Sequence, residues 1–150
     1  MTLKLLEAAT HAYAAGIAVV PVVRWDLYDT RYSEHYMGDP RSRRAAYDKS
    51  DGLHDTAKIT DPLLLMYGMT DDNVLFQNST EFMAKMQEGR LLFEAMVYPG
   101  KTHAISGPNV SVFLYQTLQR FLARNGVAPV LHKAEPGRLP TVIILVPSSN

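Results

Sequence analysis

A carboxylate and a histidine each follow a short apolar segment in the second half of the chain. One polar loop reads Gly68-Met69-Thr70-Asp71-Asp72-Asn73-Val74, and the next reads Pro99-Gly100-Lys101-Thr102-His103-Ala104. In a Ser-His-acid triad the acid orients the imidazole that acts as general base, and one known chain order is Ser, then Asp or Glu, then His. The spacing of Asp71 and His103 suits two members of such a triad. An Asp-Asp-Asn turn and a solvated loop histidine would give the same pattern.

The third member of a triad has no counterpart in the sequence. A strained turn that exposes a nucleophilic serine needs Gly-x-Ser-x-Gly, and this string does not occur in the 150 residues. We interpret Ser79, Ser106 and Ser111 as ordinary loop or cap serines. The sequence has no cysteine, and His11, His35, His54 and His132 lack metal-ligand spacing, so we predict no metal site and no cofactor.

Three short apolar runs alternate with helical patterns around these loops. The runs are Ile17–Val22, Leu63–Tyr67 and Leu92–Tyr98, and helical patterns cover the stretches before Gly16, from Phe76 to Gly89, and from Val110 to Leu122. The order helix, strand, long insert, strand, helix, strand, helix is typical of a parallel sheet covered on both faces. Ligand sites in such sheets lie beyond the carboxyl ends of the strands.

Local signals within the helical patterns predict where they begin and end. Asn78 and Glu81 are spaced for a capping arrangement at the start of the second helix. The third pattern stops near Asn125-Gly126, a typical helix end.

Composition excludes several partner classes. Fifteen basic and fifteen acidic residues give a net charge of zero, so we expect no nucleic-acid partner. The first 15 residues lack the pattern of a signal peptide, and the longest apolar run near the C-terminus is far too short to span a bilayer, so we expect no membrane segment in this chain.

The insert over residues 24–58 is unusually aromatic for a connection between strands. Trp25, Tyr28, Tyr32, Tyr36 and Tyr47 all lie within it. Taken alone, this density indicates a packed surface excursion or a binding surface.

Three strings together resemble the prolyl oligopeptidase clan and, within it, the dipeptidyl peptidase IV-like serine peptidases. They are the segment from Gly16 to Gly38, the segment from Gly68 to Phe76, and the tyrosine-proline-glycine stretch ending at His103. The resemblance covers residues 1–125 and implies the C-terminal half of an α/β-hydrolase fold, with a mostly parallel sheet and flanking helices. Residues 126–150 form an atypical tail to which we assign no function.

The resemblance also implies roles for individual residues. It makes Asp71 the triad acid and His103 the general base, whereas Asp72 has no catalytic role. It assigns Asn73 a hydrogen bond to a substrate carbonyl. The wall of a small apolar pocket for a penultimate proline or alanine would comprise Val22, Trp25, Tyr28, Tyr32 and Val74.

The resemblance further implies a serine exopeptidase that releases N-terminal dipeptides through an acyl-enzyme. The family's serine string would stand directly before Met1, so we expect a fragment that is inactive alone. The sequence departs from the family pattern at two positions. Tyr67 stands in place of a histidine, and Ala104 stands in place of a glycine; alanine would resist positive φ there. Alternatives are a non-catalytic remnant or interaction module, and an acylaminoacyl peptidase or esterase of the same clan.

The expected partner is a peptide with penultimate proline or alanine. The resemblance is also compatible with a homodimer of the full-length protein from which such a fragment would come. Localisation stays undetermined between periplasm and cytoplasm.

Overall fold

The computed structural model describes residues 1–127 and 142–145. Its elements, in chain order, are α1 (Thr2–Ala8), β1 (Ala15–Val19), η1 (Trp25–Leu27), α2 (Thr30–Met37), α3 (Arg44–Ser50), η2 (Thr56–Lys58), β2 (Leu63–Gly68), α4 (Phe76–Glu88), β3 (Glu94–Tyr98), α5 (Pro108–Arg124) and β4 (Val142–Leu145).

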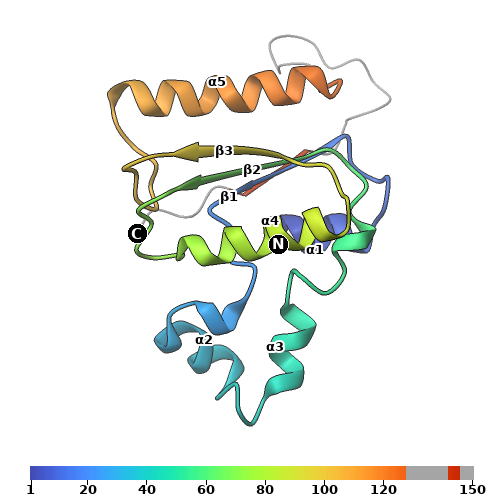
Figure 1. Ribbon diagram of the computed structural model, residues 1–150, viewed down its shortest axis with the longest axis vertical. Coiled ribbons are helices and arrows are strands. Elements are labelled where there is room, and N and C mark those ends of the chain that lie inside the picture. Colours follow the sequence, from blue (N-terminus) through green and yellow to red (C-terminus); the bar gives the residue numbers. More distant parts are fainter. Residues whose placement is uncertain (128–141, 146–150) are drawn as a thin grey trace.

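The four strands form one parallel sheet in the order β3-β2-β1-β4. In Figure 1, α5 lies on one face of the sheet, and α1 and α4 lie on the other. Both faces are therefore covered, and every residue of β1 and β2 is buried, as expected for continuous apolar strands in a parallel sheet. The predicted alternation of strands and helices is confirmed.

Apolar side chains from all three sheet-covering helices fill the core. Leu6 of α1, Phe82 and Met86 of α4, and Phe121 of α5 are each at most 2% exposed. They pack against central strand residues such as Leu65. The helical periodicity read from the sequence thus corresponds to the faces that contact the sheet.

Two predicted boundaries are wrong by three residues or more. The first strand was expected to run to Val22, but β1 ends at Val19 because the backbone turns at Val20, whose φ is 43°. Pro21 then lacks an N–H to continue the ladder. The first helix was expected to approach Gly16, but α1 ends at Ala8.

Part of the C-terminal tail joins the sheet. Val142 to Leu145 form β4, which pairs in parallel with β1 from Ala15 to Ala18. The longest apolar run near the C-terminus, Val142–Val146, therefore contains a strand from Val142 to Leu145. The remainder of the predicted 126–150 tail beyond Val127 lies outside the described residues.

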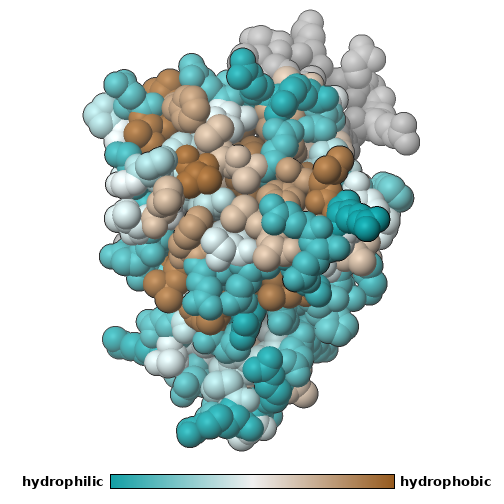
Figure 2. Space-filling model, in the orientation of Figure 1, coloured by the Kyte–Doolittle hydropathy of each residue, from teal (hydrophilic) through white to brown (hydrophobic). Residues whose placement is uncertain are grey.

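The insert contains helical segments rather than an irregular excursion. α2 and α3 project from the layer that contains α1 and α4 (Figure 1). Hydrophilic residues cover most of this projection, whereas apolar residues gather over the sheet-bearing half (Figure 2). Within the described ranges, no helix has the length and hydrophobicity that crossing a membrane requires.

Candidate functional site

Asp71 and His103 form a hydrogen-bonded pair beyond the carboxyl ends of neighbouring strands. Asp71 follows β2, His103 follows β3, and the distance from His103 Nδ1 to Asp71 Oδ2 is 3.0 Å. A carboxylate only accepts hydrogen bonds, so the imidazole donates through Nδ1–H, which leaves Nε2 as its free acceptor. The Asp71 side chain is 2% exposed and that of His103 is 23% exposed. A buried carboxylate thus orients a partly accessible imidazole.

The second carboxylate oxygen of Asp71 organises its own loop. Asp71 Oδ1 accepts backbone N–H groups from Asn73 at 2.9 Å and from Val74 at 3.0 Å. The carboxylate therefore cannot rotate without breaking two loop hydrogen bonds, which fixes Oδ2 toward the imidazole.

Gly68, the last residue of β2, allows two loops to meet. They are the loop that carries Asp71 (residues 69–74, the acid loop) and the loop that carries His103 (residues 99–104, the histidine loop). A Cβ at this position would lie 2.2 Å from the Lys101 carbonyl oxygen and 2.6 Å from that of Thr102. The close approach also permits a hydrogen bond from the Thr70 N–H to the Lys101 carbonyl at 3.1 Å. Only glycine fits between the strand end and the segment that carries His103.

The histidine loop accommodates alanine after His103. Ala104 does not have positive φ; the left-handed residues around it are Gly100, with φ of 67°, and Ile105, with φ of 43°. Ile105 is 2% exposed and belongs to the core cluster, so its packing holds this conformation in place.

The three aromatic residues predicted for the pocket cluster after β1. The Trp25 and Tyr32 rings stack at 5.8 Å with an interplanar angle of 19°, and Tyr28 meets both rings edge-on at 5.8 and 5.7 Å. Such contacts hold flat apolar surfaces rigidly. The cluster joins η1 to α2, which explains the aromatic density of the insert.

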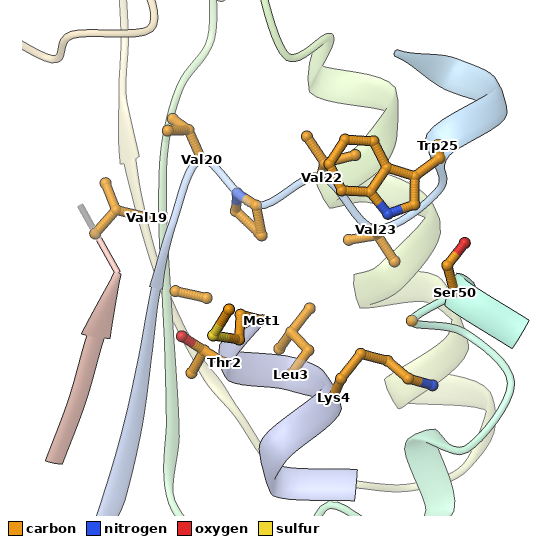
Figure 3. A pocket seen from close by; sticks show the side chains of 13 residues that line it. Met1, Thr2, Leu3, Lys4, Val19, Val20, Val22, Val23, Trp25 and Ser50 are labelled. Atoms are coloured by element: carbon orange, nitrogen blue, oxygen red, sulfur yellow. The ribbon is translucent and has the colours of Figure 1, made fainter. Parts of the chain in front are cut away.

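A cavity of about 230 Å³ lies between α1 and the segment after β1. In Figure 3, Met1 and Leu3 face Val20 and Val22 across it, and Trp25 stands at one end. Val22 and Trp25 were predicted as pocket residues, whereas no sequence pattern indicated that α1 would supply the opposite wall. Thr2 also lines the cavity, and its buried hydroxyl has no hydrogen-bond partner among the residues that the structure describes.

The predicted site residues fall into two groups, each at its own place in the fold. Val22, Trp25, Tyr28 and Tyr32 belong to the segment after β1. The second group comprises Asn73, Val74, Asp71 and His103 at the ends of β2 and β3. Asn73 is exposed and Val74 is buried.

The predicted capping role of Asn78 and Glu81 is wrong. Within the described part of the chain, no side chain caps α4, whose first residue is Phe76. Instead, the fully buried Asn78 Oδ1 accepts the backbone N–H groups of Val23 at 3.0 Å and Arg24 at 2.9 Å. The Asn78 side chain thus points across to the segment after β1, a direction that residue spacing along one helix cannot reveal.

Arg24 adds an ionic connection at the same place. Its guanidinium donates to Asp26 at 2.6 Å and to Glu81 on α4 at 2.8 Å. The hydrogen bond from Arg24 lowers the pKa of Asp26, and the bonds to Asp26 and Glu81 raise the pKa of Arg24. All three side chains are partly buried, so solvent screens the network less than an exposed pair.

The candidate serines lie in ordinary positions. Ser79 is buried within α4, Ser106 is exposed before α5, and Ser111 belongs to the first turns of α5. Among the hydrogen bonds of the described residues, none joins a serine to His103.

Comparisons with known proteins agree with this arrangement. The model of the prolyl oligopeptidase family matches residues 1–126. A probable dipeptidyl-aminopeptidase B of Tuber melanosporum is 32% identical over 151 residues, which cover 92% of this chain and 16% of the relative. A protein of the same name from Coccidioides posadasii is 35% identical over 144 residues, covering 89% of this chain and 16% of the relative.

A solved structure gives the same result at the level of the fold. The crystal structure of Porphyromonas gingivalis dipeptidyl peptidase 4 superposes with a TM-score of 0.80 at 34% identity, over 83% of this chain and 18% of that one. The expected α/β-hydrolase fold is thereby confirmed. The chain spans about a sixth of the length of the relatives that it matches.

Proposed function

Because the chain belongs to the prolyl oligopeptidase family, we propose that it supplies the acid, the general base and the proline pocket of a dipeptidyl-peptidase site. The observation that carries this proposal is the 3.0 Å hydrogen bond between Asp71 Oδ2 and His103 Nδ1 at the carboxyl edge of the sheet.

In the proposed reaction, His103 Nε2 takes the proton of a serine hydroxyl as the serine oxygen attacks the scissile carbonyl. The imidazolium then gives the proton to the leaving amine, and a water molecule repeats the sequence to release the dipeptide. Asp71 holds the imidazole in the tautomer that makes Nε2 the acceptor and stabilises the imidazolium.

The proposed pocket receives the penultimate proline or alanine. A proline ring has no donor, so flat aromatic and aliphatic surfaces suit it, and the stacked Trp25 and Tyr32 with Tyr28 provide such surfaces. Asn73, which is exposed in the acid loop, would donate to a substrate carbonyl.

The 150 residues contain no Gly-x-Ser-x-Gly string, so we propose that the chain alone does not carry out acyl transfer. The test is hydrolysis of a Gly-Pro anilide by the purified chain and by its His103→Ala variant. We expect equal background rates. Turnover that disappears in His103→Ala would overturn the proposed inactivity.

Binding tests the pocket separately from catalysis. The chain has one tryptophan, Trp25, so its fluorescence reports occupation of the pocket directly. We expect the dipeptide Ala-Pro to change the emission at lower concentration than Ala-Lys. Preference for N-acetylalanine amide would instead favour the acylaminoacyl peptidase class, and the absence of any response would contradict the pocket.

A further inference from the structure

We propose that Asn78 is a positioning residue that couples the aromatic pocket wall to the loop carrying Asp71. That this wall contacts substrate rests on the function proposed above. The coupling itself rests on contacts of α4, the helix that follows the acid loop and reaches the segment after β1.

Asn78 is connected to the acid loop through a short, fixed path. Val74 donates its backbone N–H to Asp71 Oδ1, and the Asn78 N–H donates to the Leu75 carbonyl at the start of α4. Only three residues lie between Val74 and Asn78, and these are held by loop and helix hydrogen bonds. A displacement of the acid loop would therefore move Asn78.

On its other side, Asn78 fixes the backbone that leads to Trp25. One amide oxygen accepts two consecutive N–H groups, from Val23 and Arg24, immediately before η1 begins at Trp25. The segment here is not in a strand, so its N–H groups need a side-chain acceptor when buried. Asn78 supplies that acceptor from within the core, where it is 0% exposed.

Arg24 reinforces the same connection on the surface side. Its guanidinium spans Asp26, within η1, and Glu81, one turn after Asn78 on α4. Two independent attachments, one buried and one ionic, therefore join α4 to the residues on either side of Trp25. The aromatic cluster then extends this fixed point to Tyr28 and Tyr32.

The test uses the single tryptophan as a local reporter in the full 150-residue chain. For Asn78→Ala we expect a weaker near-ultraviolet circular dichroism band of the stacked indole and greater quenching of Trp25 by acrylamide. We also expect the dissociation constant for Ala-Pro to rise about tenfold, because two hydrogen bonds no longer fix the wall.

Matched variants separate positioning from stability. Asn78→Asp retains an acceptor oxygen but buries a carboxyl group, so the folded variant should have lower thermal stability and keep the wild-type Trp25 signals. Phe82→Leu disturbs the buried face of the same helix without removing either attachment, and it should lower thermal stability while leaving the Trp25 signals unchanged. If Asn78→Ala does not fold, Arg24→Met removes the surface attachment and should change the signals in the same direction.

Three results would overturn the proposal. They are wild-type Trp25 signals in Asn78→Ala, equal changes in Phe82→Leu and Asn78→Ala, and failure of Asn78→Asp to preserve the signals. If the wild-type chain does not bind Ala-Pro but Asn78→Ala alters Trp25, the proposed function fails and the coupling stands. If the wild-type and Asn78→Ala chains bind Ala-Pro equally and their Trp25 signals match, the coupling fails and the proposed function stands.

Discussion

Replacing Gly68 with alanine should separate the acid loop from the histidine loop. The new methyl would lie 2.2 Å from the Lys101 carbonyl oxygen and 2.6 Å from the Thr102 carbonyl oxygen. Both neighbours are backbone atoms, which cannot move aside by a change of rotamer. The histidine loop must therefore shift by about 1 Å, the distance needed to restore an ordinary contact.

Two opposing terms set the magnitude. Overpacking of this kind typically costs about 1–3 kcal/mol, whereas replacing a glycine that has ordinary φ restricts the unfolded chain and stabilises by about 0.4–1 kcal/mol. The steric term is larger, so we expect a net loss of about 1–2 kcal/mol. For a chain of this size that corresponds to a fall in melting temperature of about 4 °C.

Two measurements check this prediction. Urea unfolding followed by far-ultraviolet circular dichroism gives the free energy of unfolding, and the NMR signal of the His103 Nδ1 proton reports its hydrogen bond to Asp71. We expect Gly68→Ala to lower the free energy of unfolding. It should also shift or broaden the His103 Nδ1 proton signal, because the 3.0 Å distance between His103 Nδ1 and Asp71 Oδ2 can no longer be kept.

Gly89 offers the matched control. A Cβ there would meet the flexible end of the Leu91 side chain at 3.2 Å and the Lys85 carbonyl oxygen at 3.5 Å, an ordinary contact distance, and the backbone φ is −75°. Gly89→Ala should therefore leave both measurements close to wild type. A Gly68→Ala chain as stable as the wild type with an unchanged His103 signal would refute the steric reasoning.

Three further predictions concern buried polar groups. Asp71→Asn should destabilise the chain by about 1–3 kcal/mol and change the NMR signals of the His103 ring, because an amide has one acceptor oxygen for the two loop N–H groups and the imidazole; unchanged ring signals would count against the orienting role. Burial raises the pKa of Glu7, with Lys4 opposing the shift, so the protonated form favours folding. The stabilisation that Glu7 contributes to the wild-type chain should be complete below about pH 4.3 and should be lost as the pH rises through the raised pKa of the folded chain. Thermal melts of Glu7→Gln should not show this loss. Thr2→Val should raise the free energy of unfolding by about 1 kcal/mol in urea titrations, because it removes a buried hydroxyl that lacks a hydrogen-bond partner within residues 1–127 and 142–145; a decrease would indicate that the hydroxyl has a bound partner.

Periodicity and residue type determined the architecture from the sequence alone. Continuous apolar runs bounded by Pro and Gly predicted strands such as Leu63–Tyr67, and 3.6-residue spacing predicted α4 and α5. Because strands in a parallel sheet all end at one edge, the sequence also indicated that Asp71 and His103 would lie at neighbouring strand ends. These features depend on short-range patterns, which a linear sequence displays.

The tertiary structure decided which side chains cross between elements. Asn78 looked like a helix cap but bonds to Val23 and Arg24, more than fifty residues earlier in the chain. The need for Gly68 arises from carbonyl groups of the histidine loop, and the cavity beside Trp25 exists because α1 packs opposite it. Each depends on the direction of a side chain and on the separation of two backbones, and these are set by how helices and strands pack rather than by any local pattern.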